Sequence, residues 1–167
     1  EVAGEVCDGF ICHGFTTEKY LREVTLPALR RGRAKAGKTM VGFEIVGPSF
    51  VVTGNSADEM QQAASGTRQQ IAFYGSTPAY SGVLEIHGWN DLQPQLNALS
   101  KQGKWVEMGD LITDEILNTF AVVGEPETIA PELTKRYGDV IQRLSFYAPY
   151  SSDQSRWAQV IADIKSV

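Results

Sequence analysis

The sequence is poor in the residues that build metal centres and disulfide frameworks. It contains two cysteines, Cys7 and Cys12, and two histidines, His13 and His87. The histidines are far apart in the chain, and no C-x-x-C or H-x-x-E-H pattern is present, so we expect no metal site. A disulfide would need the two cysteine Cα atoms within about 7 Å of each other, which an intervening extended strand makes difficult. We therefore expect reduced thiols in a cytoplasmic protein.

The chain also lacks a long apolar run and an excess of basic charge. No run approaches the ~20 residues of a membrane span, so we expect no membrane partner. The formal net charge of −5 argues against a nucleic-acid partner. A local basic run covers Arg30, Arg31, Arg33, Lys35 and Lys38. We interpret this run as a solvated helix end that complements the helix dipole, in preference to a phosphate site.

Signature loops for nucleotides and for nucleophilic catalysis are missing as well. The glycines do not have the spacing of a P-loop or of a dinucleotide-binding loop. Ser145 lies in a predicted strand without the surroundings of a nucleophile elbow. No secretory signal is visible, and the chain opens at Glu1 without a methionine, so we expect it to have been cut from a longer protein. Residue chemistry alone therefore predicts a soluble α/β piece with unknown catalytic residues.

What the sequence does contain is a clear alternation of strands and helices. At 167 residues and 43% hydrophobic side chains, the chain is long enough for one domain with its own core. Continuous apolar runs predict three buried strands at residues 10–12, 41–53 and 141–147. Helical spacing of apolar residues predicts helices at residues 1–6, 16–37, 56–74 and 126–138 and from 151 onward.

The long second helix carries signals for its start and for a break. Thr16 or Thr17 can cap its first turn, because a threonine hydroxyl accepts a hydrogen bond from a free backbone N–H. Pro27 interrupts the helical pattern, so we expect a kink or two abutting segments near Thr25.

Later elements carry similar signals. Gly47-Pro48 lies inside the second strand and predicts a bend or bulge there, because proline cannot donate a hydrogen bond to the ladder. Two pairs of residues have the spacing of a capping box and are expected to open helices: Ser56 with Glu59, and Ser151 with Gln154.

Residues 76–119 show no convincing strand and are expected to form a helical insertion. Short helical pieces are predicted at residues 78–87, 91–102, 104–112 and 114–119. An elaboration of this length is typical of a lid or an interface. Its aromatic side chains can line a pocket or form the small core of the insertion, and we favour the core: Phe73, Tyr74, Tyr80, Trp89 and Trp105.

The order of elements predicts the later part of a (β/α)8 barrel. Right-handed crossovers make the three strands parallel, and three parallel strands with two open edges are a poor domain by themselves. A complete barrel needs about 250 residues. Because such barrels place their chemistry at the carboxyl ends of the strands, function is expected around Cys12, His13 and Phe15.

Several segments in this order resemble the luciferase-like monooxygenase superfamily. They are GEVCDGFICHGFTTEKYLREVTLPALRRGRAKAG, GFEIVGPSFVVTG, IAFYGSTPAYSGVLEIHGW and FAVVGEPETIAPELTKRYGDVIQRLSFYAPY, the last with a Gly-x-Pro-Glu turn at residues 124–127. More narrowly, they resemble the branch of oxidoreductases that use the deazaflavin coenzyme F420. Each motif is weak, and their order and spacing together are more specific.

The resemblance implies a single partial luciferase-like barrel domain over residues 1–167 with the insertion at about 76–119. It implies an F420-dependent enzyme, with FMN as the alternative cofactor, that performs hydride transfer or monooxygenation on a small organic substrate. It places Cys12, His13 and Phe15 at the cofactor ring, and Tyr74 and Tyr80 at the substrate mouth. The strands that carry the family's proton-donating residues are absent from this chain. No catalytic residue is therefore assigned, and the fragment alone is expected to be inactive.

Two questions stay open at this level. His13 is either a proton donor or cofactor contact, or a histidine packed at a strand end. The chain as a whole is either part of this oxidoreductase or a non-catalytic α/β module that binds a partner or small molecule. The exposed strand edges expected of a partial barrel predict a homo-oligomer or association with the missing half of the barrel.

Overall fold

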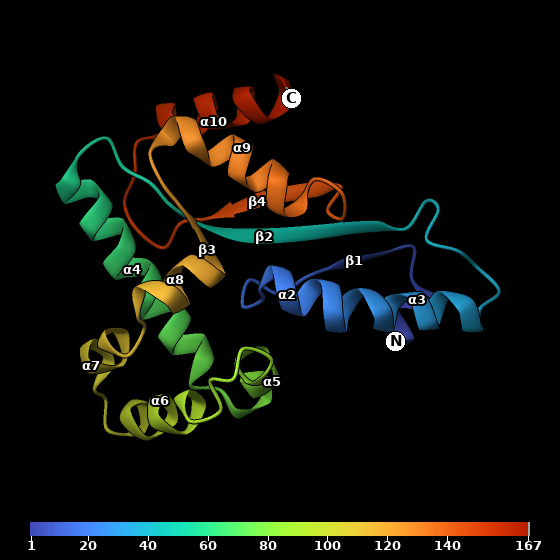
Figure 1. The fold of residues 1–167 in the computed structure, drawn as a ribbon, viewed down its shortest axis with the longest axis horizontal. Helices are drawn as coiled ribbons and strands as arrows, with labels where there is room; N and C mark the ends of the chain where they lie inside the picture. The colour runs from blue at the N-terminus through green and yellow to red at the C-terminus, as the bar shows by residue number, and fades with distance from the viewer. Residues whose placement is uncertain (167) are drawn as a thin grey trace.

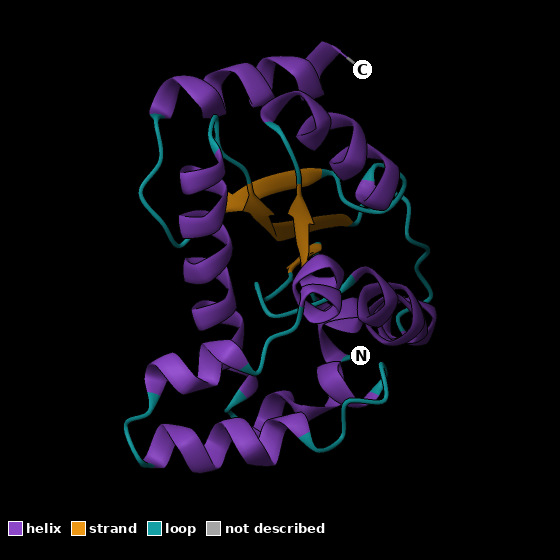
Figure 2. Ribbon diagram, turned by 60° about the vertical axis from the view of Figure 1, so that its left-hand side comes forward, coloured by secondary structure: helices purple, strands orange, loops and turns teal. Residues whose placement is uncertain are grey.

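The computed structural model describes residues 1–166, and their strands form one parallel sheet with helices around it (Figure 2). The predicted strands correspond to β1 (Gly9–Ile11), β2 (Glu44–Val52) and β4 (Arg143–Tyr147). A fourth, three-residue strand, β3 (Ala121–Val123), follows the helical insertion. The predicted α/β class with parallel strands is confirmed.

Strand β2 is the centre of the sheet. On one side it pairs with β1 through residues 44–46 and with β3 through residues 50–52, and on the other side with β4 through residues 46–50. The carbonyl of Val46 accepts from Cys12, and that of Val52 accepts from Gly124. Even-numbered residues of β2 therefore direct their backbone polar groups toward β1 and β3.

The predicted bend or bulge at Gly47-Pro48 is wrong, and this backbone alternation explains why. The register between β2 and β4 runs from Val46 to Phe50 without an extra residue. Pro48 is even-numbered, so its missing N–H lies on the side of β1 and β3. Positions 47–49 fall between those two pairings. Proline therefore removes no ladder hydrogen bond, and the strand continues through it.

One face of the sheet is covered by α1 (Val2–Val6), α3 (Leu26–Lys35), α9 (Pro126–Tyr137) and α10 (Gln154–Ser166). Odd-numbered side chains of β2, Ile45 and Val51, pack there with apolar residues of α3, α9 and α10. The short helix α2 (Glu18–Tyr20) precedes α3, and its Tyr20 packs against a second core. No helix within residues 1–166 is long and apolar enough to cross a membrane.

The predicted start and break of the second helical region are confirmed. The Thr17 hydroxyl accepts from the Tyr20 N–H at 3.1 Å, which caps α2. A π-helical turn, η1 (Leu21–Thr25), joins α2 to α3, and Pro27 lies in the first turn of α3. Proline is tolerated there because the first N–H groups of a helix have no intrahelical partner.

The second group of helices comprises α4 (Ala57–Gly75), η2 (Pro78–Tyr80), α5 (Ser81–Glu85), α6 (Leu92–Lys101), α7 (Trp105–Asp110) and α8 (Asp114–Phe120). Helix α4 packs against α6, α7 and α8, and Figure 1 shows it leading away from the end of the sheet. We call residues 57–120 the helical cap. Its core is formed with even-numbered side chains at the end of β2, Phe50 and Val52.

Of the two predicted capping boxes, the first forms with a one-residue difference and the second does not form. The Ser56 hydroxyl accepts from the Glu59 N–H at 3.2 Å, as predicted, but the Glu59 carboxylate accepts from Asn55 at 2.8 Å. For α10, the predicted Ser151 cap is wrong. The Asp153 carboxylate accepts from the Ser155 N–H at 2.9 Å, because Asp153 directly precedes the first helical residue.

Helix α10 is attached to the base of the cap through Arg156. This residue is buried, donates to the Thr53 carbonyl at 3.3 Å and forms an ion pair with Glu59 of α4. Beside it, the Tyr150 hydroxyl donates to the Val51 carbonyl at 2.8 Å. These contacts fix the junction at which β2 turns into α4.

The junction predicts an acid-sensitive contribution to stability. Hydrogen bonding to Asn55 and then to Arg156 lowers the pKa of Glu59. Because the folded-state pKa is the lower one, the ionised carboxylate stabilises the fold above its unfolded pKa, and this is lost as the pH falls from about 5 toward 3. We expect Glu59→Gln to be less stable at pH 7 and to lose less stability over that interval in urea unfolding. Glu132→Gln, which removes an exposed i,i+3 pair, is the control. An identical pH slope in the wild type and Glu59→Gln would contradict the expectation.

Candidate active site

A cluster of aromatic side chains lies where the carboxyl ends of β1 and β4 meet the cap. His13 comes two residues after β1, and Tyr147 is the last residue of β4. Tyr74 is in the last turn of α4, and Tyr80 ends η2. Parallel α/β folds place their binding sites at this end of the sheet.

Four of the five site residues predicted from the sequence come together in this cluster. The ring of His13 lies 4.9 Å from that of Tyr74 and 5.0 Å from that of Tyr80, measured between centroids. Phe15 lies 5.8 Å from Tyr80 and stacks on Phe120 of the cap at 4.7 Å. Phe15 is buried, whereas His13 is exposed and the two tyrosines are half-buried. Phe15 therefore forms the base of the cluster and His13 its accessible edge.

The imidazole of His13 is held in one orientation. Its Nδ1 accepts a hydrogen bond from the Phe15 N–H at 3.0 Å. In the neutral ring, Nδ1 as acceptor places the proton on Nε2. One ring nitrogen is thus bonded at the strand end, as in the packed alternative, and a role of His13 toward a cofactor stays a prediction.

Cys12, the fifth predicted residue, is not brought into the cluster. Neighbouring residues in an extended segment point to opposite faces. The Cys12 side chain is accordingly buried among Leu21, Ile45 and Val51 on the helix-covered face of the sheet. Burial raises the pKa of its thiol to about 11, which keeps the group protonated and unreactive at neutral pH.

Tyr147 belongs to the cluster and was missed by sequence reasoning. Its hydroxyl lies 2.9 Å from that of Tyr74, and its ring stacks on Phe50 at 4.7 Å. Burial, and then the hydrogen bond with Tyr74, raise the pKa of Tyr147 to about 12. One signal in the sequence could have found it: Tyr147 ends a predicted parallel strand. Because the carboxyl ends of parallel strands lie at the same end of a sheet, this position brings Tyr147 near the residues that follow β1.

Gly14 allows the loop after β1 to approach that ring. A Cβ atom at this position would lie 3.0 Å from Cδ1 of Tyr147, closer than side chains normally pack. Because glycine has no side chain, the backbone between His13 and Phe15 can pack directly against the Tyr147 ring. The position of His13 thus depends on the end of β4.

His87 connects the cap to the start of α2. Its Nε2 lies 2.9 Å from the Thr17 hydroxyl, and its ring stacks on Trp89 at 4.7 Å. Burial lowers the pKa of His87, which favours the neutral ring. The Thr17 oxygen also accepts from the Tyr20 N–H, so one hydroxyl joins His87 of the cap to the first turn of α2. This histidine holds the cap in place.

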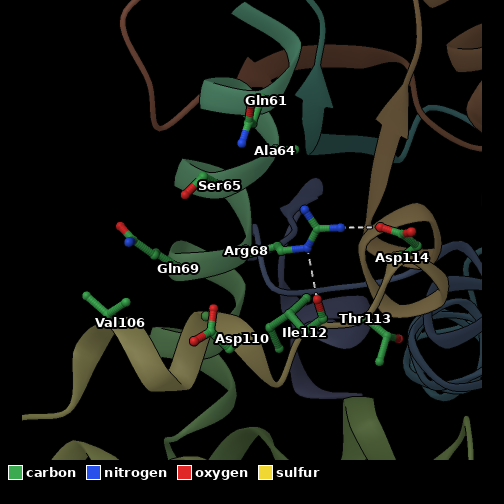
Figure 3. Close-up of a pocket in the computed structure, with 11 residues that line it drawn as sticks. Gln61, Ala64, Ser65, Arg68, Gln69, Val106, Asp110, Ile112, Thr113 and Asp114 are labelled. Atoms are coloured by element: carbon green, nitrogen blue, oxygen red, sulfur yellow. Dashed lines mark hydrogen bonds and ion pairs between the residues drawn. The ribbon is translucent and has the colours of Figure 1, made fainter. Parts of the chain in front are cut away.

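A separate polar cavity of about 520 Å³ lies within the cap, between α4 and the segment that joins α7 to α8 (Figure 3). Arg68 crosses it: its Nε donates to the Ile112 carbonyl at 2.9 Å, and its guanidinium pairs with Asp114. Figure 3 shows Gln61, Ser65 and Gln69 along the α4 side. Arg68 is engaged in joining two cap segments, so we place the candidate active site at the aromatic cluster instead.

A parallel α/β sheet with accessible polar and aromatic side chains at its strand ends is typical of barrel and doubly wound α/β folds. The comparison with known families agrees with this class. The model of the family described as "Luciferase-like monooxygenase" matches residues 1–143. The chain belongs to the luciferase-like monooxygenase family.

Relatives include proteins without an assigned activity and one reductase. Uncharacterised proteins of Mycobacterium tuberculosis and Mycobacterium bovis are 50% identical over 144 residues, which cover 86% of this chain and 42% of theirs. The 5,10-methylenetetrahydromethanopterin reductase of Archaeoglobus fulgidus is 26% identical over 168 residues, covering 96% of this chain and 48% of the reductase. The chain thus spans less than half the length of these relatives.

A solved structure shows the same fold. The coenzyme F420-dependent tetrahydromethanopterin reductase of Methanopyrus kandleri superposes with a TM-score of 0.66 at 19% identity, covering 85% of this chain and 40% of that one. This match confirms the fold predicted from the sequence, a portion of a luciferase-like (β/α)8 barrel.

The placement of the two cysteines predicts unequal thiol reactivity. Cys7 is exposed and Cys12 is buried. We expect a disulfide reagent such as DTNB to modify one thiol rapidly in the native protein and the second slower by about a hundredfold or more, since the second requires opening of the fold. Cys7→Ser is expected to abolish the fast phase. A fast phase that survives in Cys7→Ser would place Cys12 at the surface.

The tyrosine pair predicts an alkaline loss of stability. The raised folded-state pKa of Tyr147 means that its protonated form stabilises the fold below the unfolded pKa of about 10, and that this is lost as the pH rises toward about 12. We expect Tyr147→Phe to lose less stability than the wild type between pH 9 and 11, measured by urea unfolding. Tyr80→Phe controls for the loss of a hydroxyl from the same cluster. Equal alkaline slopes in the wild type and Tyr147→Phe would contradict the assignment.

Proposed function

We propose that the protein carrying this chain is an oxidoreductase that uses coenzyme F420 to transfer a hydride to or from a small organic substrate. The observation that carries the proposal is that His13, Phe15, Tyr74 and Tyr80 meet at the strand ends of a luciferase-like fold. The likeness to two methanopterin reductases, one of them described as F420-dependent, supports F420 over FMN. Monooxygenation with FMN is the alternative within the same family.

The residues of the cluster fit a planar heteroaromatic ring. Half-buried and exposed ring faces suit stacking, which is the main contact such a ring makes. The Nε2 proton of His13 and the hydroxyls of Tyr74 and Tyr147 suit its polar edge. The coenzyme, when bound, carries the hydride chemistry, and the protein supplies binding and orientation.

Each side chain would contribute a distinct part of that binding. The Phe15 ring stacks on Phe120 and packs against the tyrosines from the buried side of the cluster. His13 is oriented by the Phe15 N–H, so its donor direction is fixed before a ligand arrives. Cys12 was predicted as a cofactor contact, and from its buried position it would act only by packing behind the strand. Tyr74 and Tyr80 come from the cap and would border the substrate.

Association with further strands is part of the proposal. Ile11 of β1 is 75% exposed, and Arg143 and Ser145 on the same face of β4 are exposed too. A parallel sheet is normally covered on both faces. We propose that this face is covered in the working protein by the remainder of a barrel or by a second copy, that the cytoplasm is its compartment, and that the 167-residue chain alone does not turn over substrate.

The cofactor proposal is tested by titration of the natural-length protein that contains this chain. We expect F420 fluorescence to be quenched in a saturable way, with FMN binding at least tenfold more weakly. His13→Ala is expected to weaken F420 binding about tenfold, because a stacking face and an oriented donor are lost. Val41→Ala, at an exposed residue before β2, is the control. Failure of F420 to bind, tighter binding of FMN, or unchanged binding and hydride transfer in His13→Ala would overturn the corresponding part.

A further inference from the structure

An exposed apolar patch lies on the cap next to the candidate active site. Phe73 of α4 is 51% exposed, and Trp105 and Val106 of α7 are 53% and 69% exposed. Of the other aromatic residues of the cap, Tyr74, Tyr80 and Trp89 are partly buried against its core, and Phe120 is part of that core. Large side chains gathered on one exposed surface mark a binding region more often than isolated ones do.

The patch is continuous with the aromatic cluster. The Phe73 ring lies 5.7 Å from that of Tyr74 and 6.3 Å from that of Trp105. Tyr74 in turn contacts His13 and is joined to Tyr147 through their hydroxyls. A row of ring contacts therefore leads from the end of β1 across α4 to α7.

A groove of about 430 Å³ runs beside this row. It is lined by Gly66, Gln69, Gln70, Trp105, Val106 and Pro149, among others. Gln70 is one helical turn before Tyr74 on the same side of α4. Pro149 comes two residues after Tyr147, so each wall of the groove contains a residue close in sequence to a tyrosine of the cluster.

Gly66 brings these walls together. A Cβ atom at Gly66 would lie 2.8 Å from the Pro149 carbonyl oxygen, so only glycine permits this approach of α4 to the segment after β4. The groove is thus bounded at Gly66 and Pro149, where the two backbones meet.

The chemistry of the lining selects a neutral, flat ligand. None of the lining side chains is ionisable: they are amides, an indole, aliphatic groups, a thioether and a proline ring. A charged group would lose water here without gaining a charged partner. A planar ring can stack on the Trp105 indole while its polar edge bonds to the amides of Gln69 and Gln70. The volume suits a group of about one or two rings.

We propose that this groove is a substrate subsite that binds a neutral planar heteroaromatic group, at a distance from the atom that exchanges hydride. The inference rests on the proposed function, because it places the reacting part of the same substrate at the His13–Tyr74 cluster. It makes Trp105, Phe73 and Gln70 determinants of substrate specificity. A substrate for this site is an elongated molecule with a heteroaromatic end that carries amide-like groups.

The test uses quinolin-2-one, a neutral bicyclic lactam, as the probe, with quinoline-2-carboxylate as its anionic counterpart. Nitrogen-15 spectra of the 167-residue chain contain indole signals of Trp89, Trp105 and Trp157, assigned by single Trp→Phe variants. We expect quinolin-2-one to shift the Trp105 indole and the side-chain amides of Gln69 and Gln70 in a saturable way, with Trp157 unaffected. The carboxylate is expected to bind at least tenfold more weakly.

Variants distinguish binding at the groove from non-specific binding to exposed apolar residues. Trp105→Ala is expected to weaken quinolin-2-one binding at least tenfold and Trp105→Phe by less, whereas Ile161→Ala, at an exposed apolar residue of α10, is expected to leave it unchanged. Phe73→Ala provides a second measure if Trp105→Ala does not fold. Equal effects of Ile161→Ala and Trp105→Ala, equal binding of the anion, or shifts centred on Trp157 would overturn the proposal.

Two further outcomes are distinguishable. If the Trp105 signal moves with protein concentration and not with probe, the groove is an interface between copies of the chain, and the subsite is refuted. If the probe binds as expected but F420 fails to bind the natural-length protein, the groove stands as a heteroaromatic site and the proposed F420-dependent function falls. If F420 binds as expected but the probe does not bind at the groove, the subsite is refuted and the proposed function stands.

Discussion

The structure depends on the burial of β2 from both faces while both of its edges are paired. Alternation along an extended strand sends Ile45 and Val51 toward the flanking helices, and Phe50 and Val52 toward the cap. Two cores therefore meet at one strand. Burial of side chains of this size on each face contributes about 1.5–3 kcal/mol apiece relative to exposure, before the opposing chain entropy is counted. The register of β2 consequently fixes the positions of β1, β3 and β4.

This register brings the site together. β1 and β4 pair in parallel with opposite sides of β2, so His13 and Tyr147 both lie at the carboxyl end of the sheet. In the sequence, 133 intervening residues separate them. The cap then approaches that end and supplies Tyr74. Gly14 permits the loop after β1 to approach Tyr147, because a side chain at this position would contact the Tyr147 ring. The cluster is therefore a product of long-range pairing, with no local motif behind it.

The features that could be predicted from the sequence are those that a few neighbouring residues determine. The Thr17 cap and the break before Pro27 are local hydrogen-bonding and ring constraints, and both are confirmed. The effect of Pro48 on the strand depends on its position between the segments of β2 that pair with β1 and with β3, where no neighbouring strand needs its N–H. A rule that considers only the proline therefore predicted a distortion that did not occur. Tyr147 was missed for the same reason, because its value as a site residue comes from a distant strand.

The position of α4 was also beyond local reasoning, and it has the largest consequence for function. Its pattern of apolar residues is that of an amphipathic helix in any α/β unit. The sequence cannot specify whether its apolar side meets the flank of the sheet or the other helices of the insertion. In the structure it meets α6, α7 and α8, and it therefore carries Tyr74 to the strand ends and exposes Phe73 beside Trp105. A single helix thus contributes to both the ring site and the groove. Because α4 supplies Tyr74 to the ring cluster and Gln70 to the groove, a shift of this helix would change both together.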